Sequence, residues 1–399
     1  MRGLNAARVM RITGHQTDTG TSFGGLMDPK MAIARNRLAI PLAVATAIVG
    51  LVACSSGSVA TKIVEFHESI DVWSLAFSPD GQHLAVSSPT YTEVHVWKWP
   101  GKTPELVQKL QQQGGGQLNG LRFTRDGKFL ASAHGPGKEN QLVRIWSGLT
   151  WSLVGDIAEV KAVGGVLENA NLEFTPDAKF LVRVAGGGWY MDGLTKVILV
   201  DGLVVYDGDT RQRLWGLPLP VNGEEFALSP DARSAVVVGM ERRERNGDPF
   251  LQAKLCLVDL DGKQVASCDD ILPGASYLGF AAWSPDGHYI AVSGDPGESS
   301  DPGKRGKPLP GPGLALFDVK NRRTVSTFPV HDHLAQLEYS PDGRYLVVGS
   351  WFRGVEIWNS EHTKLLQHIS GRITAAKLSV DGRHLAVANG EDVTIWDIR

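Results

Sequence analysis

Short apolar runs and turn residues alternate along the chain from about residue 61 to its last residue. The first instance is Leu-Ala-Phe-Ser-Pro-Asp-Gly at residues 75–81, and a run rich in apolar residues follows it. Short runs of alternating apolar and polar residues, bounded by Pro, Asp and Gly, are typical of antiparallel strands joined by tight turns. The pattern therefore predicts an all-β chain of short strands.

The same turn recurs six more times, with Ser or Thr at its first position and Asp at its third. The later copies lie at residues 124–127, 175–178, 229–232, 284–287, 340–343 and 379–382. Ser or Thr opens such a turn, Pro fixes φ near −65° at the second position, Asp bonds the local backbone, and Gly takes the strained corner. Ala178 and Ala232 replace that glycine and predict weaker turns.

Each repeated unit also closes on a similar apolar and aromatic pair. The closures are Val96-Trp97, Ile145-Trp146, Val205-Tyr206, Leu257-Val258, Leu316-Phe317, Ile357-Trp358 and Ile395-Trp396. Together, the turns and closures resemble the WD-repeat β-propeller family over about residues 61–399, roughly 48 residues per unit. The resemblance implies a seven-bladed β-propeller of four-stranded antiparallel blades around a central channel. The Gly-His pair that family members often carry before the first strand of a blade is missing.

The two ends of the repeated region predict how the ring closes. The last unit stops at Arg399 directly after its third strand, whereas residues 61–67 alternate apolar and polar side chains before the first complete unit. We expect this N-terminal strand to pair with the last blade, because an uncovered strand edge invites aggregation.

The first 54 residues have the pattern of an export signal. Lys30, Arg35 and Arg37 precede an uncharged apolar run at residues 38–53, which ends in Leu-Val-Ala before Cys54. This resembles bacterial lipoprotein signals, which are cleaved before a cysteine that is then lipidated. The resemblance implies an extracytoplasmic, membrane-anchored protein, on the periplasmic side in a Gram-negative cell and compatible with its outer membrane. The alternative is an uncleaved anchor helix.

The expected organisation is a signal peptide at 1–54, a short linker at 55–60 and one propeller at 61–399. Met27 and Met31 are alternative translation starts.

Composition and charge narrow the class of protein further. With 42% hydrophobic residues, 21% charged residues and a mean hydropathy of −0.10, the composition is that of a folded globular chain. The formal net charge is −3, although residues 1–37 hold six Lys or Arg against two Asp. The remainder is therefore acidic, which argues against nucleic-acid binding through phosphate neutralisation.

Cys256 and Cys268 flank an Asp-Gly turn signal at residues 261–262. They would lie at nearly facing positions of neighbouring antiparallel strands, where a disulfide is compatible with an oxidising compartment. The alternative is two small buried thiols, because a shift of one residue would point the side chains to opposite faces.

One face of the propeller is predicted to be elaborated, because the connections between the second and third strands lengthen in blades two to five. These loops are expected at 134–141, 186–196, 240–253 and 294–313. Aromatic residues and Arg are enriched at binding hot spots, so we predict a protein-binding face here and in the matching loop of blade six. Its residues are Trp189, Tyr190, Phe250, Arg242, Arg243, Arg245, Trp351, Phe352 and Arg353. The alternative is that the aromatic side chains pack against their own loops.

Candidate chemistry is sparse. The strands that line the channel carry Arg122, Glu173, Glu338 and Lys377, which predict ion pairs between blades or a solvated wall. The sequence contains no nucleophile elbow, zinc-binding helix, phosphate loop or Cys/His metal spacing, so no catalytic residue, metal or cofactor is predicted. The leading hypothesis is a non-enzymatic scaffold that binds protein partners in the bacterial cell envelope. The alternatives are a propeller enzyme, such as a lactonase or other hydrolase, and a small-ligand sensor at the channel mouth.

Overall fold

A computed structural model describes most of the repeated region. The described residues are 58–88, 90, 93–111, 118–134, 142–158, 170–185, 189–192, 195–198, 202–245, 248–272, 277–295, 313–328 and 333–399. Ser58–Asp192 and Lys196–Arg399 form one compact unit. Cys54 and the rest of the predicted signal peptide lie outside the described residues.

The unit consists of seven four-stranded antiparallel sheets, the blades, whose strands are given from the axis outwards. Blade one consists of β2 (Ser74–Phe77), β3 (His83–Ser87), β4 (Glu93–Lys98) and β5 (Glu105–Gln111). Blade two consists of β6 (Leu118–Phe123), β7 (Phe129–His134), β8 (Leu142–Ser147) and β9 (Leu153–Ala158). Blade three consists of β10 (Ala170–Phe174), β11 (Phe180–Ala185), β14 (Leu203–Asp207) and β15 (Arg213–Leu217). Blades four and five are β16 (Asn222–Leu228), β17 (Ser234–Arg245), β18 (Asp248–Asp259) and β19 (Gln264–Asp270); and β20 (Tyr277–Trp283), β21 (Tyr289–Asp295), β22 (Leu314–Asp318) and β23 (Arg323–Phe328). Blades six and seven are β24 (Leu334–Tyr339), β25 (Tyr345–Ser350), β26 (Gly354–Asn359) and β27 (Leu365–Ser370); and β28 (Ala375–Leu378), β29 (His384–Asn389), β30 (Asp392–Ile398) and β1 (Ala60–His67).

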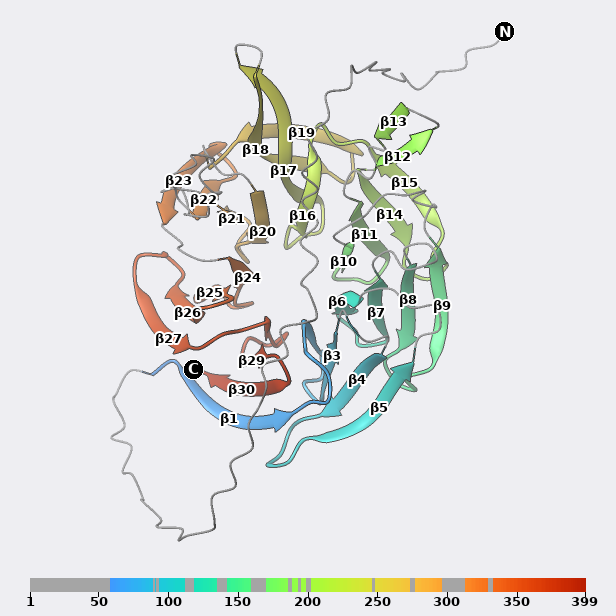
Figure 1. Ribbon diagram of the computed structural model, residues 1–399, viewed down its shortest axis with the longest axis vertical. Helices are drawn as coiled ribbons and strands as arrows, with labels where there is room; N and C mark the ends of the chain where they lie inside the picture. Colours follow the sequence, from blue (N-terminus) through green and yellow to red (C-terminus); the bar gives the residue numbers. More distant parts are fainter. Residues whose placement is uncertain are drawn as a thin grey trace, which may run out of the picture. The chain divides into compact units, whose positions relative to one another are not determined.

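The blades follow one another around a common axis (Figure 1). The innermost strand of each blade contacts that of the next, and β28 of the last blade contacts β2 of the first. Seven clusters of buried apolar side chains fill the interfaces between neighbouring blades. The predicted seven-bladed propeller is therefore confirmed, and its core is distributed around the ring.

The repeated turn owes its shape to a short network of hydrogen bonds. In blade one, Ser78 Oγ donates to Asp80 Oδ1 at 2.5 Å, and Asp80 Oδ1 accepts the Gln82 backbone N–H at 2.9 Å. The same two bonds recur in the other six turns. Partial burial alone would raise the pKa of Asp80, but these bonds hold it below its ordinary value. Ser or Thr and Asp are thus required by the turn itself.

The fourth position of every turn has a positive φ. Gly81, Gly127, Gly287, Gly343 and Gly382 have φ between 67° and 73°, whereas Ala178 and Ala232 have φ of 58° and 56°. A Cβ atom in this left-handed region costs roughly 1 kcal/mol relative to glycine.

We therefore expect Ala178→Gly and Ala232→Gly each to raise the free energy of unfolding by about 0.5–1 kcal/mol. Chemical denaturation of the single and double variants measures the gain, which should be additive because the turns belong to different blades. Ala85→Gly, in the middle of the buried strand β3, is the control and should destabilise the protein. A loss of stability in either turn variant would contradict this explanation.

The predicted closure of the ring by the N-terminal strand is also confirmed. β1 pairs antiparallel with β30 from Ala60 opposite Ile398 to His67 opposite Asp392, with an irregularity between Lys62 and Val64. Val64 is buried among side chains of blades seven and one. The first and last parts of the chain therefore share one blade.

A buried charged cluster lies where the closing strand ends. Glu68, the residue after β1, accepts hydrogen bonds from His95 Nδ1 at 2.9 Å and from Trp97 Nε1, and Glu93 Oε2 lies 3.1 Å from His95 Nε2. Glu68 and His95 are 1% and 0% exposed. Both ring nitrogens of His95 face carboxylates, so the arrangement calls for the imidazolium form, because neutral imidazole has one N–H only. Burial opposes both charges, yet the hydrogen bonds raise the pKa of His95 and lower that of Glu68.

Two of the predicted loops contain strands. Residues 240–253 were expected to form a loop, but β17 and β18 remain paired as far as Arg245 opposite Asp248. The resulting hairpin extends past its neighbours β16 and β19, whose pairing ends at Met240 and Lys254 (Figure 1). In blade three, β12 (Trp189–Asp192) and β13 (Thr195–Ile198) form a separate two-stranded sheet that begins in the predicted loop 186–196 and extends two residues beyond it.

Candidate interaction face

The propeller has two faces that differ in the connections they carry. The seven Ser/Thr-Asp turns and the connections from third to fourth strands lie on one face, here named the turn face. The connections from second to third strands, and those from one blade to the next, lie on the opposite face, named the loop face. The predicted partner-binding residues all belong to loop-face connections or to the strands that extend them.

Five side chains on the loop face, in two contacting groups joined through the neighbouring residues 351 and 352, are together named the Trp351 cluster. The Trp73 and Trp351 rings meet edge to face with centroids 5.5 Å apart, and the His333 ring lies 6.4 Å from that of Trp351. The Arg372 guanidinium carbon lies 5.8 Å from the centre of the Phe352 ring. The cluster thus joins blade one to blade six across the start of blade seven.

Backbone hydrogen bonds hold the Trp351 cluster in place. Trp351 N–H donates to the His333 carbonyl at 2.9 Å, and the Trp351 carbonyl accepts Ile373 N–H at 2.9 Å. The turn then reaches Gly354, whose φ of 97° and closeness to Ile369 leave no room for a Cβ atom. The glycine at this position therefore permits the tight turn that presents residues 351–353.

The residues of the Trp351 cluster differ in how far their side chains are exposed to solvent. Phe352 is 62% exposed and Trp73 is 39% exposed, whereas Trp351 is half-buried. Trp73 and His333 each directly precede an innermost strand, β2 and β24, so the cluster lies near the end of the channel. An exposed aromatic group supported by a fixed backbone is well suited to bind a partner, because little side-chain entropy remains to be lost.

The structure brings three of the predicted partner-binding residues together at this position. Trp351, Phe352 and Arg353 occupy the blade-six turn, and the Arg353 carbonyl accepts a hydrogen bond from His368 Nε2 at 2.7 Å. Trp73 and Arg372 were not predicted. The only sequence signal for Trp73 was the presence of a tryptophan in the connection that precedes the first repeated strand.

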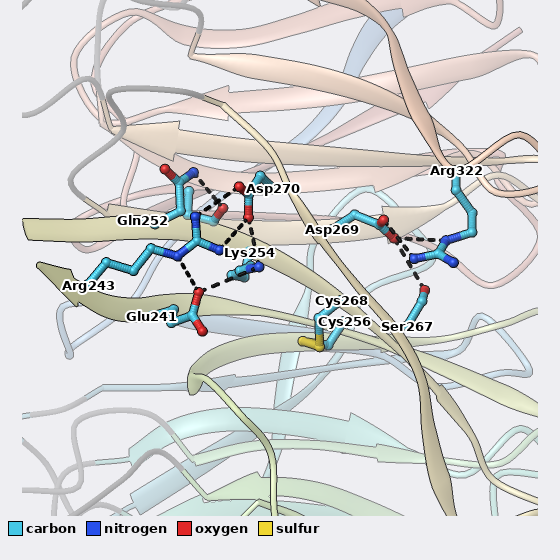
Figure 2. Close-up of polar contacts among 11 residues, drawn as sticks. Glu241, Arg243, Gln252, Lys254, Cys256, Ser267, Cys268, Asp269, Asp270 and Arg322 are labelled. Carbon is cyan, nitrogen blue, oxygen red and sulfur yellow. Dashed lines mark hydrogen bonds and ion pairs between the residues drawn. A yellow bond between two sulfur atoms is a disulfide. The ribbon is translucent and has the colours of Figure 1, made fainter. Parts of the chain in front are cut away.

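A second group of charged residues lies at the base of the blade-four hairpin. Figure 2 shows Arg243 between Glu241 and Asp270, with Nε–Oε2 and Nη1–Oδ2 distances of 2.7 and 3.0 Å. Lys254 Nζ lies 2.7 Å from Asp270 Oδ1, and chiefly Lys254, followed by Arg243, lowers the pKa of that carboxyl group. The charge of Arg243, a predicted partner-binding residue, is therefore already neutralised by Glu241 and Asp270.

The other predicted residues lie on strands. Trp189 and Tyr190 are in β12, Arg242 and Arg245 are in β17, and Phe250 pairs with Arg243 across the hairpin. Their side chains lie outside what the structure describes. The structure therefore places their backbone on the elaborated part of the loop face.

Cys256 and Cys268 face each other on β18 and β19. They form a register pair with Cα atoms 4.0 Å apart, and their sulfur atoms are bonded at 2.00 Å (Figure 2). The next pair toward the loop face on the same side is Lys254 and Asp270. The disulfide therefore ties the two outer strands of blade four together at the base of the long hairpin.

Charged side chains of the channel wall contact the neighbouring blade. Lys377 Nζ lies 2.6 Å from Glu338 Oε1, as predicted, whereas Glu173 accepts the Leu228 backbone N–H at 3.1 Å and forms no ion pair with Arg122 among the described residues. Burial raises the pKa of Glu173, against the hydrogen bond from Leu228 and the charge of Arg122. Both carboxylates thus join adjacent blades.

The described ranges contain neither a metal-binding group nor a membrane-spanning helix. In these ranges, no group of three or more His, Cys, Asp and Glu side chains is placed to hold a metal ion. Nor does this part of the chain contain a helix that is long and apolar enough to cross a membrane.

Comparisons with known proteins agree with this architecture. The family described as WD domain, G-beta repeat matches residues 51–98 and 322–359. Protein HIR1 of Kluyveromyces lactis is 22% identical over 264 residues, which cover 57% of this chain but only 27% of that protein. The solved structure of Kuenenia stuttgartiensis hydrazine synthase superposes with a TM-score of 0.66 at 16% identity, covering 83% of this chain and 96% of the other. The chain therefore contains WD40 repeats, and its propeller fold is shared with that solved structure.

Proposed function

We propose that this chain is a lipid-anchored WD-repeat propeller that acts as a non-enzymatic protein-interaction scaffold in the bacterial cell envelope. The observation that carries the proposal is the Trp351 cluster, in which Phe352 and Trp73 expose large apolar area on the loop face. WD40 repeats are consistent with a role in binding other proteins. A rigid ring that presents such a surface needs no catalytic group to perform this role.

The physical gain from binding comes from burial of those exposed aromatic side chains. Full burial of one large apolar side chain contributes roughly 1.5–3 kcal/mol. Arg372, stacked against Phe352, adds a positive charge at the margin of the cluster. A partner with an apolar pocket or groove bordered by carboxylates would therefore complement this surface.

The proposed anchor rests on the sequence around Cys54. A basic start, an apolar run and Leu-Val-Ala before the cysteine support lipidation after export. The bonded pair Cys256 and Cys268 supports the same compartment, because disulfides persist in oxidising surroundings.

The channel gives less support to an enzyme. Glu338 is paired with Lys377, and Glu173 is bonded to the backbone of the next blade. Each carboxylate thus has a structural partner, and within the described residues neither belongs to a group of three or more His, Cys, Asp and Glu side chains placed to hold a metal ion. The scaffold proposal therefore takes precedence over the lactonase, hydrolase and sensor alternatives.

The test is partner capture by the full chain carrying Trp351→Ala and Phe352→Ala. Loss of the two aromatic side chains should weaken binding of the native partner at least 100-fold, since hot-spot truncations cost about 2 kcal/mol or more each. The matched control carries Leu149→Ala and Phe180→Ala, two exposed apolar residues of the turn-face side, and should bind normally. Equal binding by both variants would contradict the proposed face, provided that their melting temperatures show both to be folded.

A further inference from the structure

The chain enters the propeller on its turn face. The first described residues, Ser58 and Val59, lead directly into β1, and the Arg399 N–H donates to the Val59 carbonyl at 2.9 Å. The Ile398 N–H donates to the carbonyl of Arg383, which directly follows the Ser379–Gly382 turn, at 2.7 Å. The start of β1 therefore lies beside a turn of the turn face.

Backbone hydrogen bonds equivalent to the one between Ile398 and Arg383 occur on the turn face of two other blades. Gly148 and Gly208 each follow the third strand of a blade and donate to the carbonyls of Lys128 and Lys179, both at 2.7 Å. Lys128 and Lys179 occupy the position equivalent to Arg383 in their own turns. The junction of Val59 with Arg399 thus takes the place of an ordinary turn-face connection.

β1 then crosses the blade and delivers the chain to the loop face. The Glu68 N–H donates to the Glu391 carbonyl at 2.7 Å, and the Val72 N–H donates to the Gly390 carbonyl at 2.9 Å. Trp73 of the Trp351 cluster is the next residue. The N-terminal attachment and the exposed aromatic surface therefore lie on opposite faces of the propeller.

We propose that the propeller stands with its turn face toward the membrane and binds a water-soluble protein through the Trp351 cluster on its outward loop face. This inference rests on the proposed lipid anchor. Four residue steps separate Cys54 from Ser58 and span at most about 14 Å when extended. So short a tether keeps the turn face close to the bilayer, whereas the thickness of the propeller separates the cluster from it.

The short tether is the basis of this orientation, and three basic side chains of the turn face are neutralised locally. Lys128, Lys179 and Arg344 project from the turn face, but each is paired with the aspartate of its own turn at 2.5–3.1 Å. Leu149, which is 82% exposed on the same face, is the kind of residue that tolerates contact with lipid headgroups. A partner embedded in the same bilayer would meet this face and not the cluster.

The orientation can be measured with the full chain purified from a lipoprotein-processing host. A fluorescent non-natural residue replaces either Gln82, exposed on the turn face, or Glu391, exposed on the loop face. Each protein is reconstituted into vesicles of phosphatidylethanolamine and phosphatidylglycerol that contain a nitroxide-headgroup lipid. The probe at position 82 should be quenched at least threefold more strongly than the probe at position 391. Equal quenching, or stronger quenching at position 391, would overturn the orientation.

Failure of the anchor is distinguished from failure of the orientation. Flotation with the vesicles and the mass of the N-terminal peptide report whether Cys54 carries lipid. If it does not, the proposed anchor is wrong, and the free Cys54 thiol is coupled to a maleimide-bearing lipid for the same comparison of probes. The ratio of quenching at positions 82 and 391 then still tests whether the turn face lies toward the membrane.

Discussion

Val64→Asp is expected to lower the free energy of unfolding by at least 3–5 kcal/mol and to open the ring at its seam. Val64 lies in the closing strand β1 and packs among buried side chains of blades seven and one. The substitution would place a carboxylate without a partner in this apolar cluster, which is among the most destabilising single changes. Urea denaturation followed by tryptophan fluorescence measures the loss.

Ile63→Asp is the matched control for this prediction. Ile63 is the neighbouring residue on the same strand but is 46% exposed, at the irregularity in the pairing with β30. The control should change stability by less than about 1 kcal/mol. Similar losses of unfolding free energy in the two variants would contradict the account, because they would show that burial of Val64 is not what holds the closing strand.

Glu68→Gln is expected to remove about 2–3 kcal/mol of stability at pH 6, and less as pH rises through the folded-state pKa of His95. The change deletes the charged partner of buried His95 while keeping an acceptor for Trp97. The raised pKa of His95 means that its charged interaction is fully present below pH 6.5 and is lost as pH rises through the folded-state pKa. The lowered pKa of Glu68 means that its contribution is lost only as pH falls below 4.5.

The measurement is the difference in unfolding free energy between the native chain and Glu68→Gln from pH 5 to pH 9. Burial lowers the pKa of His362 to about 4, so this side chain reduces the stability of both proteins as pH falls below 6.5 and cancels in the difference. Glu65→Gln, an exposed change on β1, should show no comparable pH dependence. A difference that is constant from pH 5 to pH 9 would contradict the buried ion pair.

Much of the fold could be predicted because its determinants are local. Ser78 and Asp80 build their turn with hydrogen bonds to groups within five residues, and the same phrase recurs in every blade. Closure of the ring could also be predicted, since the last unit lacks a fourth strand and residues 61–67 supply one. The facing positions of Cys256 and Cys268 followed from the turn between them.

Other features depend on distant contacts that local patterns do not reveal. The Trp73 and Trp351 rings come from blades one and six and meet only because the ring closes. The long hairpin of blade four was predicted to be a loop, because the connection between the second and third strands is longer there than in a minimal blade. Its strands continue because Glu241, Arg243, Lys254 and Asp270 neutralise one another across them.

The buried charged cluster of Glu68, His95 and Glu93, at the junction of the first and last blades, could not be predicted from the sequence either. Glu68 follows the closing strand and His95 lies in the third strand of blade one, and only folding brings their side chains together. The missing Gly-His pair signalled that the usual network was altered. It did not indicate that a buried glutamate and histidine would occupy the seam.

The loop face as a protein-binding surface is tested most directly by photo-crosslinking in living cells of the native host. A photoreactive residue in place of Phe352 should yield one defined adduct with a second protein, whereas the same residue in place of Leu149 on the turn face should not yield that adduct. Trp73→Ala in the same chain should greatly reduce the adduct, because the edge-to-face contact with Trp351 is lost. An adduct formed from position 149 and absent from position 352, or no protein adduct from either position, would contradict the proposed scaffold face.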